Sequence, residues 1–227
     1  MKKRIGLLLL FIVIAALVGF GVYSWNYYSK YIDVDTIYPG VTIQGMDVGG
    51  LSVEEAQQKV DDYVDALSEK TVTLQVEDKE KSFALRQAGL TCENPDAAKQ
   101  AEALGREGNI IKRVLQVQAI AAGGKDIPLD FSVDADKTKS IIKKKGKTLE
   151  TKKKDASLTR EDGKFVVEKE VDGISIDFNK DAEKLAALIA SPDWDQQDVT
   201  LTMDYEKDPA KHTAQELDAV QDVLGTF

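Results

Sequence analysis

The sequence predicts an α+β protein, in which an N-terminal transmembrane helix is followed by two related α+β lobes. A long apolar run at the N-terminus indicates the membrane helix. Beyond it, segments with apolar residues at every second position alternate with segments whose apolar residues recur at helical spacing. The same pattern recurs at a shift of 84 residues, which indicates an internal duplication.

The N-terminal segment is typical of a membrane anchor. Residues 2–4 are all basic, and no charged residue then appears before Lys30. About 20 apolar residues suffice for a helix to cross a bilayer, so residues 5–23 are predicted to span one. A cleaved signal peptide is the alternative, but it needs a shorter apolar stretch and small residues at a cleavage site. The bulky Tyr23 and Trp25 at the exit favour the anchor.

The charge pattern of the N-terminus also predicts the orientation. Basic residues on the short side of an anchor stay inside the cell. The chain is therefore expected to be a single-pass protein of the cell membrane, with a cytoplasmic tail at residues 1–4 and a juxtamembrane linker at residues 24–38. The rest of the chain is expected to be extracellular, with the membrane as a partner of the N-terminal helix.

Charge and cysteine content limit the possible functions. The chain has 30 Lys and Arg against 39 Asp and Glu, a net charge of −9. Such a balance does not provide a general phosphate-neutralising surface, so no nucleic-acid partner is expected. The only cysteine, Cys92, excludes an internal disulfide, and the exterior part must be held together by its apolar core.

Residues 39–125 are predicted to form the first lobe. Its expected elements are a strand at 41–43, a helix from Ser52, a hairpin over 72–85, a strand at 90–92, a helix opened by Asn94-Pro95 and a helix over 109–123. Ser52 and Glu55 have the spacing of a capping box, in which each side chain bonds the backbone N–H of the other residue. Gly89 interrupts the chain between the hairpin and the next strand.

Residues 126–211 are predicted to form the second lobe. Its expected elements are a strand over 127–133, a helix around Ile141-Ile142, a hairpin turning at Asp162-Gly163, a strand over 174–178, a helix capped by Asn179 and a strand over 199–205. Gly89 aligns with Gly173, which supports the duplication. Residues 212–227 open with a Thr213–Glu216 capping box and are expected to start a helix that leads to a missing domain.

Three stretches of the chain resemble a known family. Residues 40–56 look like the opening of VanW-family proteins, and the Gly105–Asn109 turn resembles a signature of the YoaR-like peptidoglycan-binding domain. In that family a tail similar to residues 213–227 leads into the VanW domain, which this chain lacks. The resemblance implies that residues 39–125 and 126–211 are tandem YoaR-like domains of a Gram-positive type of cell-envelope protein, in contact with peptidoglycan.

The Gly105–Asn109 turn is one candidate binding site. As structure, it stops one helix and offers Asn109 as the cap of the next, and this interpretation is favoured because it accounts for the glycines and the Asn. As a site, Arg106 and Asn109 would offer donors to a carboxylate or a sugar of a muropeptide.

A lysine-rich segment is the second candidate. Residues 137–154 contain nine lysines and a single acid, Glu150. Charge runs usually form a solvated face, which is the favoured interpretation. The alternative is an electrostatic contact with an anionic wall polymer, centred on Lys143, Lys144 and Lys145.

No catalytic, metal or cofactor site is predicted. A nucleophilic Cys usually needs a His base, and nothing in the spacing brings Cys92 and His212 together. One Cys and one His are too few for a zinc site. The predicted function is therefore non-catalytic binding to peptidoglycan or another anionic wall polymer, or a spacer role. Its alternatives are a protein-interaction ectodomain that recruits or regulates a wall enzyme and, least favoured, a carboxylate-dependent wall hydrolase.

Overall fold

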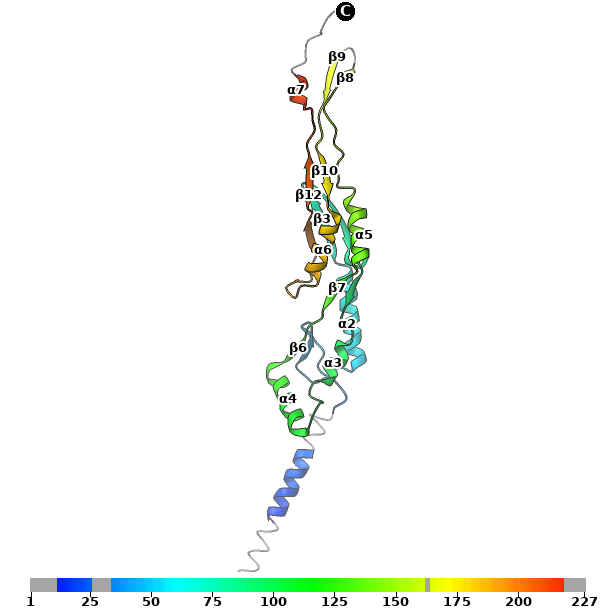
Figure 1. Cartoon of the computed structure of the whole chain (residues 1–227). Coiled ribbons are helices and arrows are strands. Elements are labelled where there is room, and N and C mark those ends of the chain that lie inside the picture. The colour runs from blue at the N-terminus through cyan, green and yellow to red at the C-terminus, as the bar shows by residue number, and fades with distance from the viewer. Residues whose placement is uncertain (1–11, 26–33, 162–163, 219–227) are drawn as a thin grey trace, which may run out of the picture. The chain divides into compact units, whose positions relative to one another are not determined.

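The computed structural model describes residues 12–25, 34–161 and 164–218 of the chain (Figure 1). It confirms the mixed α+β class, because helices alternate with small sheets. The chain divides into two compact units. The first comprises the described residues of Met1–Tyr63 together with Asn94–Leu129, and the second comprises Val64–Glu93 together with those of Asp130–Phe227. Each unit is therefore built from stretches that alternate along the chain.

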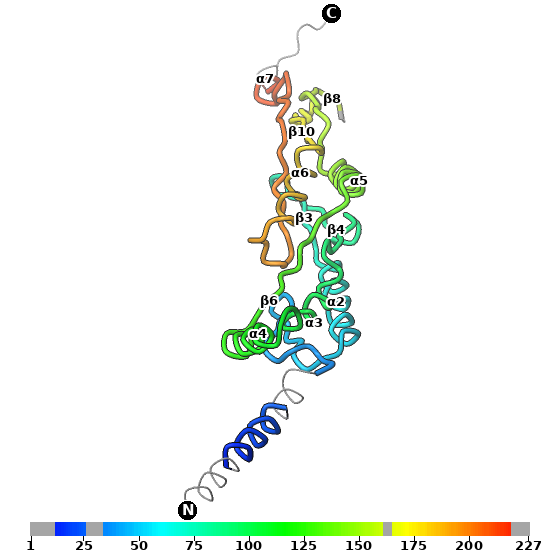
Figure 2. Tube along the Cα trace, turned by 60° about the horizontal axis from the view of Figure 1, so that its bottom comes forward, coloured from blue at the N-terminus to red at the C-terminus, as the bar shows by residue number. Residues whose placement is uncertain are grey.

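Beyond residues 12–25, the first unit combines a small sheet with the helices α2, α3 and α4. Its elements are β1 (Val41–Ile43), β2 (Met46–Asp47), α2 (Val53–Ser68, which continues into the second unit), α3 (Ala97–Ala103), α4 (Ile110–Gly123) and β6 (Lys125–Ile127). The central strand β1 pairs antiparallel with β2 and parallel with β6. Figures 1 and 2 both show α3 and α4 beside β6.

Apolar side chains from four segments form the core of the first unit. Its fully or almost fully buried members are Ile37, Tyr38, Val41, Ile43, Val48, Ala56, Val60, Ala97, Ala98, Ala101, Ile120 and Ile127. The alanines of α3 let this helix approach β1 closely, since they carry no side chain beyond Cβ.

The second unit holds most of the strands. Its elements are β3 (Thr71–Val76), β4 (Lys79–Ala84), a 3₁₀ turn η1 (Leu85–Ala88), β5 (Leu90–Cys92), β7 (Phe131–Val133), α5 (Ala135–Gly146), β8 (Ser157–Glu161), β9 (Lys164–Glu168), β10 (Gly173–Ile176), α6 (Phe178–Ile189), β11 (Val199–Thr202), β12 (Tyr205–Asp208) and α7 (Ala214–Asp218). Three strands form a sheet in the order β11-β3-β4, in which β11 runs parallel to β3. Three further antiparallel pairs are β5 with β7, β8 with β9, and β10 with β12.

Helices α5 and α6 pack against each other, and α5 also contacts β4 and η1. The alternation predicted for β3 holds, because Val72, Leu74 and Val76 are all fully buried. Trp194 packs edge-to-face on Phe131, with ring centroids 6.0 Å apart. The core of the second unit therefore lies between the β11-β3-β4 sheet and the α5–α6 pair.

Local signals in the sequence are confirmed where a few neighbouring residues decide the structure. The Ser52 amide donates to Oε2 of Glu55 at 2.9 Å, and the Glu55 amide donates to Oγ of Ser52 at 3.2 Å. The same reciprocal pair forms between Thr213 and Glu216 at the start of α7. The predicted turn at residues 162–163 lies outside the described residues, although β8 and β9 pair on both sides of it.

Two predicted strands are in fact broken. The strand expected over 127–133 is β6 and β7, which belong to different units and are separated by residues 128–130. Pro128 cannot donate to a strand ladder, and the amide of Leu129 bonds the side chain of Gln44 at 2.7 Å instead. The strand expected over 199–205 is likewise β11 and β12, because the chain changes its partner from β3 to β10.

Two predicted helix caps are also wrong, each by two residues. Asp96 stands at the N-cap of α3, whereas the side-chain Nδ2 of Asn94 donates to the Pro128 carbonyl at 2.9 Å. Asp177, not Asn179, caps α6, and it accepts from the amide of Asn179 at 3.1 Å. At each position two cap-forming residues stand two apart in the sequence, so residue type alone does not decide which of them caps the helix.

The predicted membrane helix over residues 5–23 lies partly outside the described residues. Residues 12–25 are helical, and their large apolar side chains are exposed. Within the described ranges, no helix combines the length and the apolar character that a membrane crossing requires.

The order of elements recurs along the chain as the alignment expected. Three strands and a helix follow one another as β3, β4, β5 and α3, and again as β8, β9, β10 and α6. The third strand of each set pairs antiparallel with a strand beyond its helix, β5 with β7 and β10 with β12. The duplication itself stays a prediction, as do the repeat boundaries at 39–125 and 126–211, since both units draw on both ranges.

Candidate functional site

The predicted site residue Arg106 lies in the first unit, in the turn between α3 and α4. Its Nη1 donates to the Val34 carbonyl at 2.6 Å and its Nη2 to the Thr36 carbonyl at 2.9 Å. Its Nε donates to the Glu102 carbonyl at 2.7 Å, and the guanidinium lies 5.3 Å from the centroid of the Tyr38 ring. These contacts connect residues 34–38 to the end of α3.

Asn109 follows in the same turn and caps α4. Its Oδ1 accepts a hydrogen bond from the Lys112 amide at 2.9 Å, and its own backbone is extended, as an N-cap requires. Gly105 and Gly108 both have positive φ, which allows the chain to turn between the helices. The contacts of Arg106 and Asn109 are thus those of the structural interpretation that the sequence favoured.

Lys143, Lys144 and Lys145 lie in the second unit, in the last turn of α5. Lys143 and Lys144 are exposed and Lys145 is half-buried, because Ile141, Ile142 and Gly146 take the inner face of the helix. Positive charge in the last turn of a helix interacts favourably with its free carbonyl groups. The two predicted sites therefore belong to different units, and the structure does not join them in one site.

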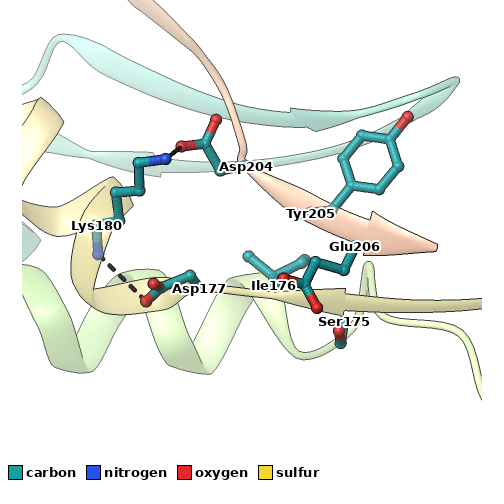
Figure 3. A pocket seen from close by; sticks show the side chains of 7 residues that line it. All are labelled: Ser175, Ile176, Asp177, Lys180, Asp204, Tyr205 and Glu206. Atoms are coloured by element: carbon teal, nitrogen blue, oxygen red, sulfur yellow. Dashed lines mark hydrogen bonds and ion pairs between the residues drawn. The ribbon is translucent and has the colours of Figure 1, made fainter. Parts of the chain in front are cut away.

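A polar pocket in the second unit was not predicted from the sequence. It has a volume of about 630 Å³ and lies where β10 passes into α6 beside the start of β12 (Figure 3). The lining residues are Ser175, Ile176, Asp177, Lys180, Asp204, Tyr205 and Glu206. Strand pairing brings these residues together, since Ser175 is opposite Glu206 and Ile176 is opposite Tyr205.

Lysine side chains hold one carboxylate at this pocket. Oδ2 of Asp204 lies 2.7 Å from Nζ of Lys180, the pair drawn in Figure 3, and Oδ1 lies 2.7 Å from Nζ of Lys184. The two ammonium groups hold the pKa of the Asp204 carboxyl below its usual range. Reciprocally, Asp204 and, less strongly, Asp181 raise the pKa of Lys184.

Asp181 lies beneath this ion-pair cluster and is completely buried. Its Oδ1 accepts from the Asp204 amide at 3.1 Å and from Nζ of Lys184 at 3.5 Å. Burial raises the pKa of the Asp181 carboxyl, and the nearby donors only partly oppose this shift. Asp181 therefore fixes the link between β11 and β12 against the first turn of α6.

A second cavity of about 670 Å³ lies at the end of α6 and the start of β11. Its lining combines Trp194 with three aspartates, Asp193, Asp195 and Asp198. The indole is 8% exposed, and Nε1 has no hydrogen-bond partner among the described residues. Nothing in the local sequence indicates that these acids share a cavity with Trp194, so this cavity was not predicted.

Both cavities are lined in part by polar side chains that could bind a polar ligand. Their carboxylates and hydroxyl groups can accept or donate hydrogen bonds to sugar hydroxyls, amides or ammonium groups. Among the described residues, no group of three or more His, Cys, Asp or Glu side chains is arranged to hold a metal ion. Cys92 is half-buried in β5.

Comparison with known proteins finds one family. Residues 82–193 match the model of a family described as "Putative peptidoglycan binding domain", and this range is just under half of the chain. No curated protein and no solved structure matches the chain. The matched range contains α5 with its lysines and part of the polar pocket, and it runs across the boundary between the two predicted repeats. Residues 82–193 are thus similar to one domain of this description, and a cell-wall binding domain implies a location outside the cytoplasm.

Proposed function

We propose that the chain is a membrane-anchored, extracytoplasmic module that binds the cell wall and catalyses no reaction. The observation that carries this proposal is the match of residues 82–193 to a family described by peptidoglycan binding. The basic N-terminus and the apolar residues 5–23 support the anchor, with the N-terminus in the cytoplasm. Tandem repeats and a place in the VanW family remain part of the proposal, on the residues that resemble that family.

We place the wall contact on the lysine surface, defined as Lys143, Lys144 and Lys145 at the end of α5. No ion pair to these lysines occurs among the described residues, whereas Lys153 and Lys154 are paired with Asp208 and Glu168 at 2.7 and 2.6 Å. Unpaired lysines keep their charge available for an anionic partner. A charge-driven contact of this kind suits the carboxylates of peptidoglycan or a phosphate-rich wall polymer.

A muropeptide contact through Arg106 and Asn109 is the weaker proposal. Three donor groups of Arg106 already bond to carbonyl oxygens, and Asn109 already caps α4. A ligand carboxylate would have to displace these bonds, and doing so would leave backbone carbonyls without their donor. A ligand that binds the lysine surface would not have to displace hydrogen bonds of this kind.

Sedimentation of the detergent-solubilised chain with purified sacculi tests the proposal. The wild type should sediment at low salt and lose binding as salt approaches 0.5 M, where the Debye length is roughly 4 Å. Replacement of the lysine surface by Gln at all three positions should weaken binding strongly. The matched control replaces Lys81, Lys99 and Lys125, three exposed lysines that are not part of α5, and should bind like the wild type. A wild-type chain that fails to sediment at low salt with teichoic acids present contradicts wall binding.

Recruitment or regulation of a wall enzyme is the second candidate function. One observation favours it: the β8–β9 hairpin carries the exposed apolar residues Leu158, Phe165 and Val166, with exposed fractions of 37%, 60% and 40%. Leu158 is opposite Val167, and Phe165 is opposite Arg160, so one face of the hairpin is largely apolar. Loss of sacculus binding together with capture of a wall enzyme that depends on Phe165 would favour this function over wall binding.

A further inference from the structure

Helix α4 exposes apolar residues on the side that faces away from the core. Its inner side carries Ile120, which is 7% exposed and whose carbonyl lies against Gly40, and Val117, which lies against Gly105. Its outer side carries Ile111 and Leu115, with exposed fractions of 69% and 60%, and Ile110 at its start is 51% exposed. An amphipathic helix on a soluble unit normally turns polar residues outward, so these apolar residues need an explanation.

The first turn of α4 carries Lys112 and Arg113 and no acidic residue. Lys112 is exposed, whereas Arg113 is half-buried and its Nε is buried. Basic residues are unfavourable at a helix N-terminus, because its free N–H groups already carry partial positive charge. Exposed large apolar residues beside basic ones are typical of a helix that lies in a membrane interface and meets anionic headgroups.

Arg106 places this helix close to the point where the chain leaves the N-terminal helix. Its guanidinium bonds the carbonyls of Val34 and Thr36, and α4 begins four residues after it, at Ile110. Only residues 26–33 separate Val34 from the helix over 12–25. A stretch of that length reaches at most about 28 Å even when fully extended. The start of α4 is therefore tethered within a short distance of any membrane that holds the N-terminal helix.

We propose that the outer side of α4, with Ile110, Ile111 and Leu115, lies on the outer surface of the bilayer that anchors the chain. This inference rests on the anchoring in the proposed function. Tethering gives the membrane a high effective concentration, so three exposed apolar side chains and the exposed Lys112 can make a contact that would be weak in a free protein. The contact would fix the orientation of the first unit on the membrane.

Lipid quenching of a fluorescent probe tests this contact on the full chain. A Cys92→Ser background carries Leu115→Cys labelled with an environment-sensitive dye, in vesicles of phosphatidylcholine and phosphatidylglycerol. The matched control carries Phe165→Cys, because Leu115 and Phe165 are both 60% exposed and both apolar, but Phe165 lies in the second unit. The expected result is a blue shift and quenching by doxyl-labelled lipids at position 115, and neither at position 165.

Carbonate extraction of the same vesicles separates the two ways in which the inference can fail. If the chain resists extraction but the probe at 115 is not quenched, the anchor stands and the contact of α4 is wrong. If the chain is extracted, the anchor is wrong and the inference falls with it. A blue shift of the probe at 115 without lipid quenching would mean that another protein or a second copy covers α4. Equal quenching of the probe at 165 would mean that the protein adsorbs to the membrane non-specifically. Either result overturns the inference.

Discussion

Arg106 shows how one side chain can stabilise a fold when each of its donor groups bonds a backbone carbonyl. Its planar guanidinium bonds the carbonyls of Val34 and Thr36, and also the carbonyl of Glu102 at the end of α3. Lysine cannot reproduce this fork, since its ammonium is a single point of charge on a flexible stem. Arg106 therefore stabilises the first unit whether or not it also contacts a ligand.

We expect Arg106→Ala to lower the free energy of unfolding of the first unit by about 1.5–3 kcal/mol, the range for a lost hydrogen bond to a charged group. Arg106→Lys should recover less than half of the loss. Hydrogen exchange measures the effect locally, at the amides of Ile37 and Gly50, which pair with carbonyls within residues 34–51. Unchanged exchange at these amides, with weaker sacculus binding, would instead assign Arg106 to the ligand contact.

Asp181 and Asp204 illustrate opposite electrostatic effects in one small cluster. Burial raises the pKa of Asp181, so its contribution to stability increases as the pH falls through that raised pKa. Lys180 and Lys184 lower the pKa of Asp204. Its contribution is present above the ordinary Asp pKa, about 3.9, and is lost as the pH falls below it.

The two aspartates should therefore change the pH dependence of stability in opposite directions. Asp204→Asn is expected to destabilise the second unit at pH 7 and to reduce the loss of stability on acidification. Asp181→Asn is expected to make that loss steeper, because it removes the group that gains stability in acid. Urea unfolding between pH 7 and pH 3 measures both, with Trp194 as the probe in a Trp25→Phe background. Identical slopes for the two variants would contradict the assignment.

At the scale of elements, Gly89 decides how η1, β5 and α5 meet. Its φ is +73°, in the left-handed region, and a Cβ there would lie 2.8 Å from Cβ of Asp134. Its carbonyl accepts from the Asp134 amide, the cap of α5, at 3.2 Å. The aligned Gly173 has no such φ and lies within β10, so the correspondence of the two glycines in sequence does not extend to their backbones.

Gly89→Ala is expected to destabilise the second unit by about 2 kcal/mol or more, since the left-handed backbone alone costs roughly 1–2 kcal/mol for a non-glycine residue. Gly173→Ala is the matched control. Its Cβ would lie 3.3 Å from the nearest atoms, at Asp208 and Lys153, and it needs no change of backbone region. The midpoint of urea unfolding measures both variants. A larger cost at Gly173 than at Gly89 would show that backbone conformation does not decide the difference.

At the scale of the whole molecule, the path of the chain is the main finding. Each unit takes two separate stretches of sequence, so neither can complete its core from one continuous segment. Parallel pairs such as β1 with β6 and β3 with β11 join residues far apart in the chain. The family match over 82–193 also draws on both units. A division of the chain at residue 125 therefore does not separate two compact bodies.

The sequence alone determined the features that depend on near neighbours. The α+β class, both capping boxes, the β3–β4 hairpin and most helix positions follow from periodicity and from pairs a few residues apart. The resemblance of the Gly105–Asn109 turn pointed to the peptidoglycan-binding description that the family match then supplied.

Only the tertiary structure decided what depends on distant partners. Two of the three carbonyls that Arg106 bonds lie about 70 residues away in sequence. The cavity beside Trp194 and the burial of Asp181 likewise arise from strands and helices packed together. The breaks after β6 and β11 arise in the same way, because each strand ends where the chain leaves one partner for another. Periodicity records which face of an element is apolar, but it contains no information about which other element will cover that face.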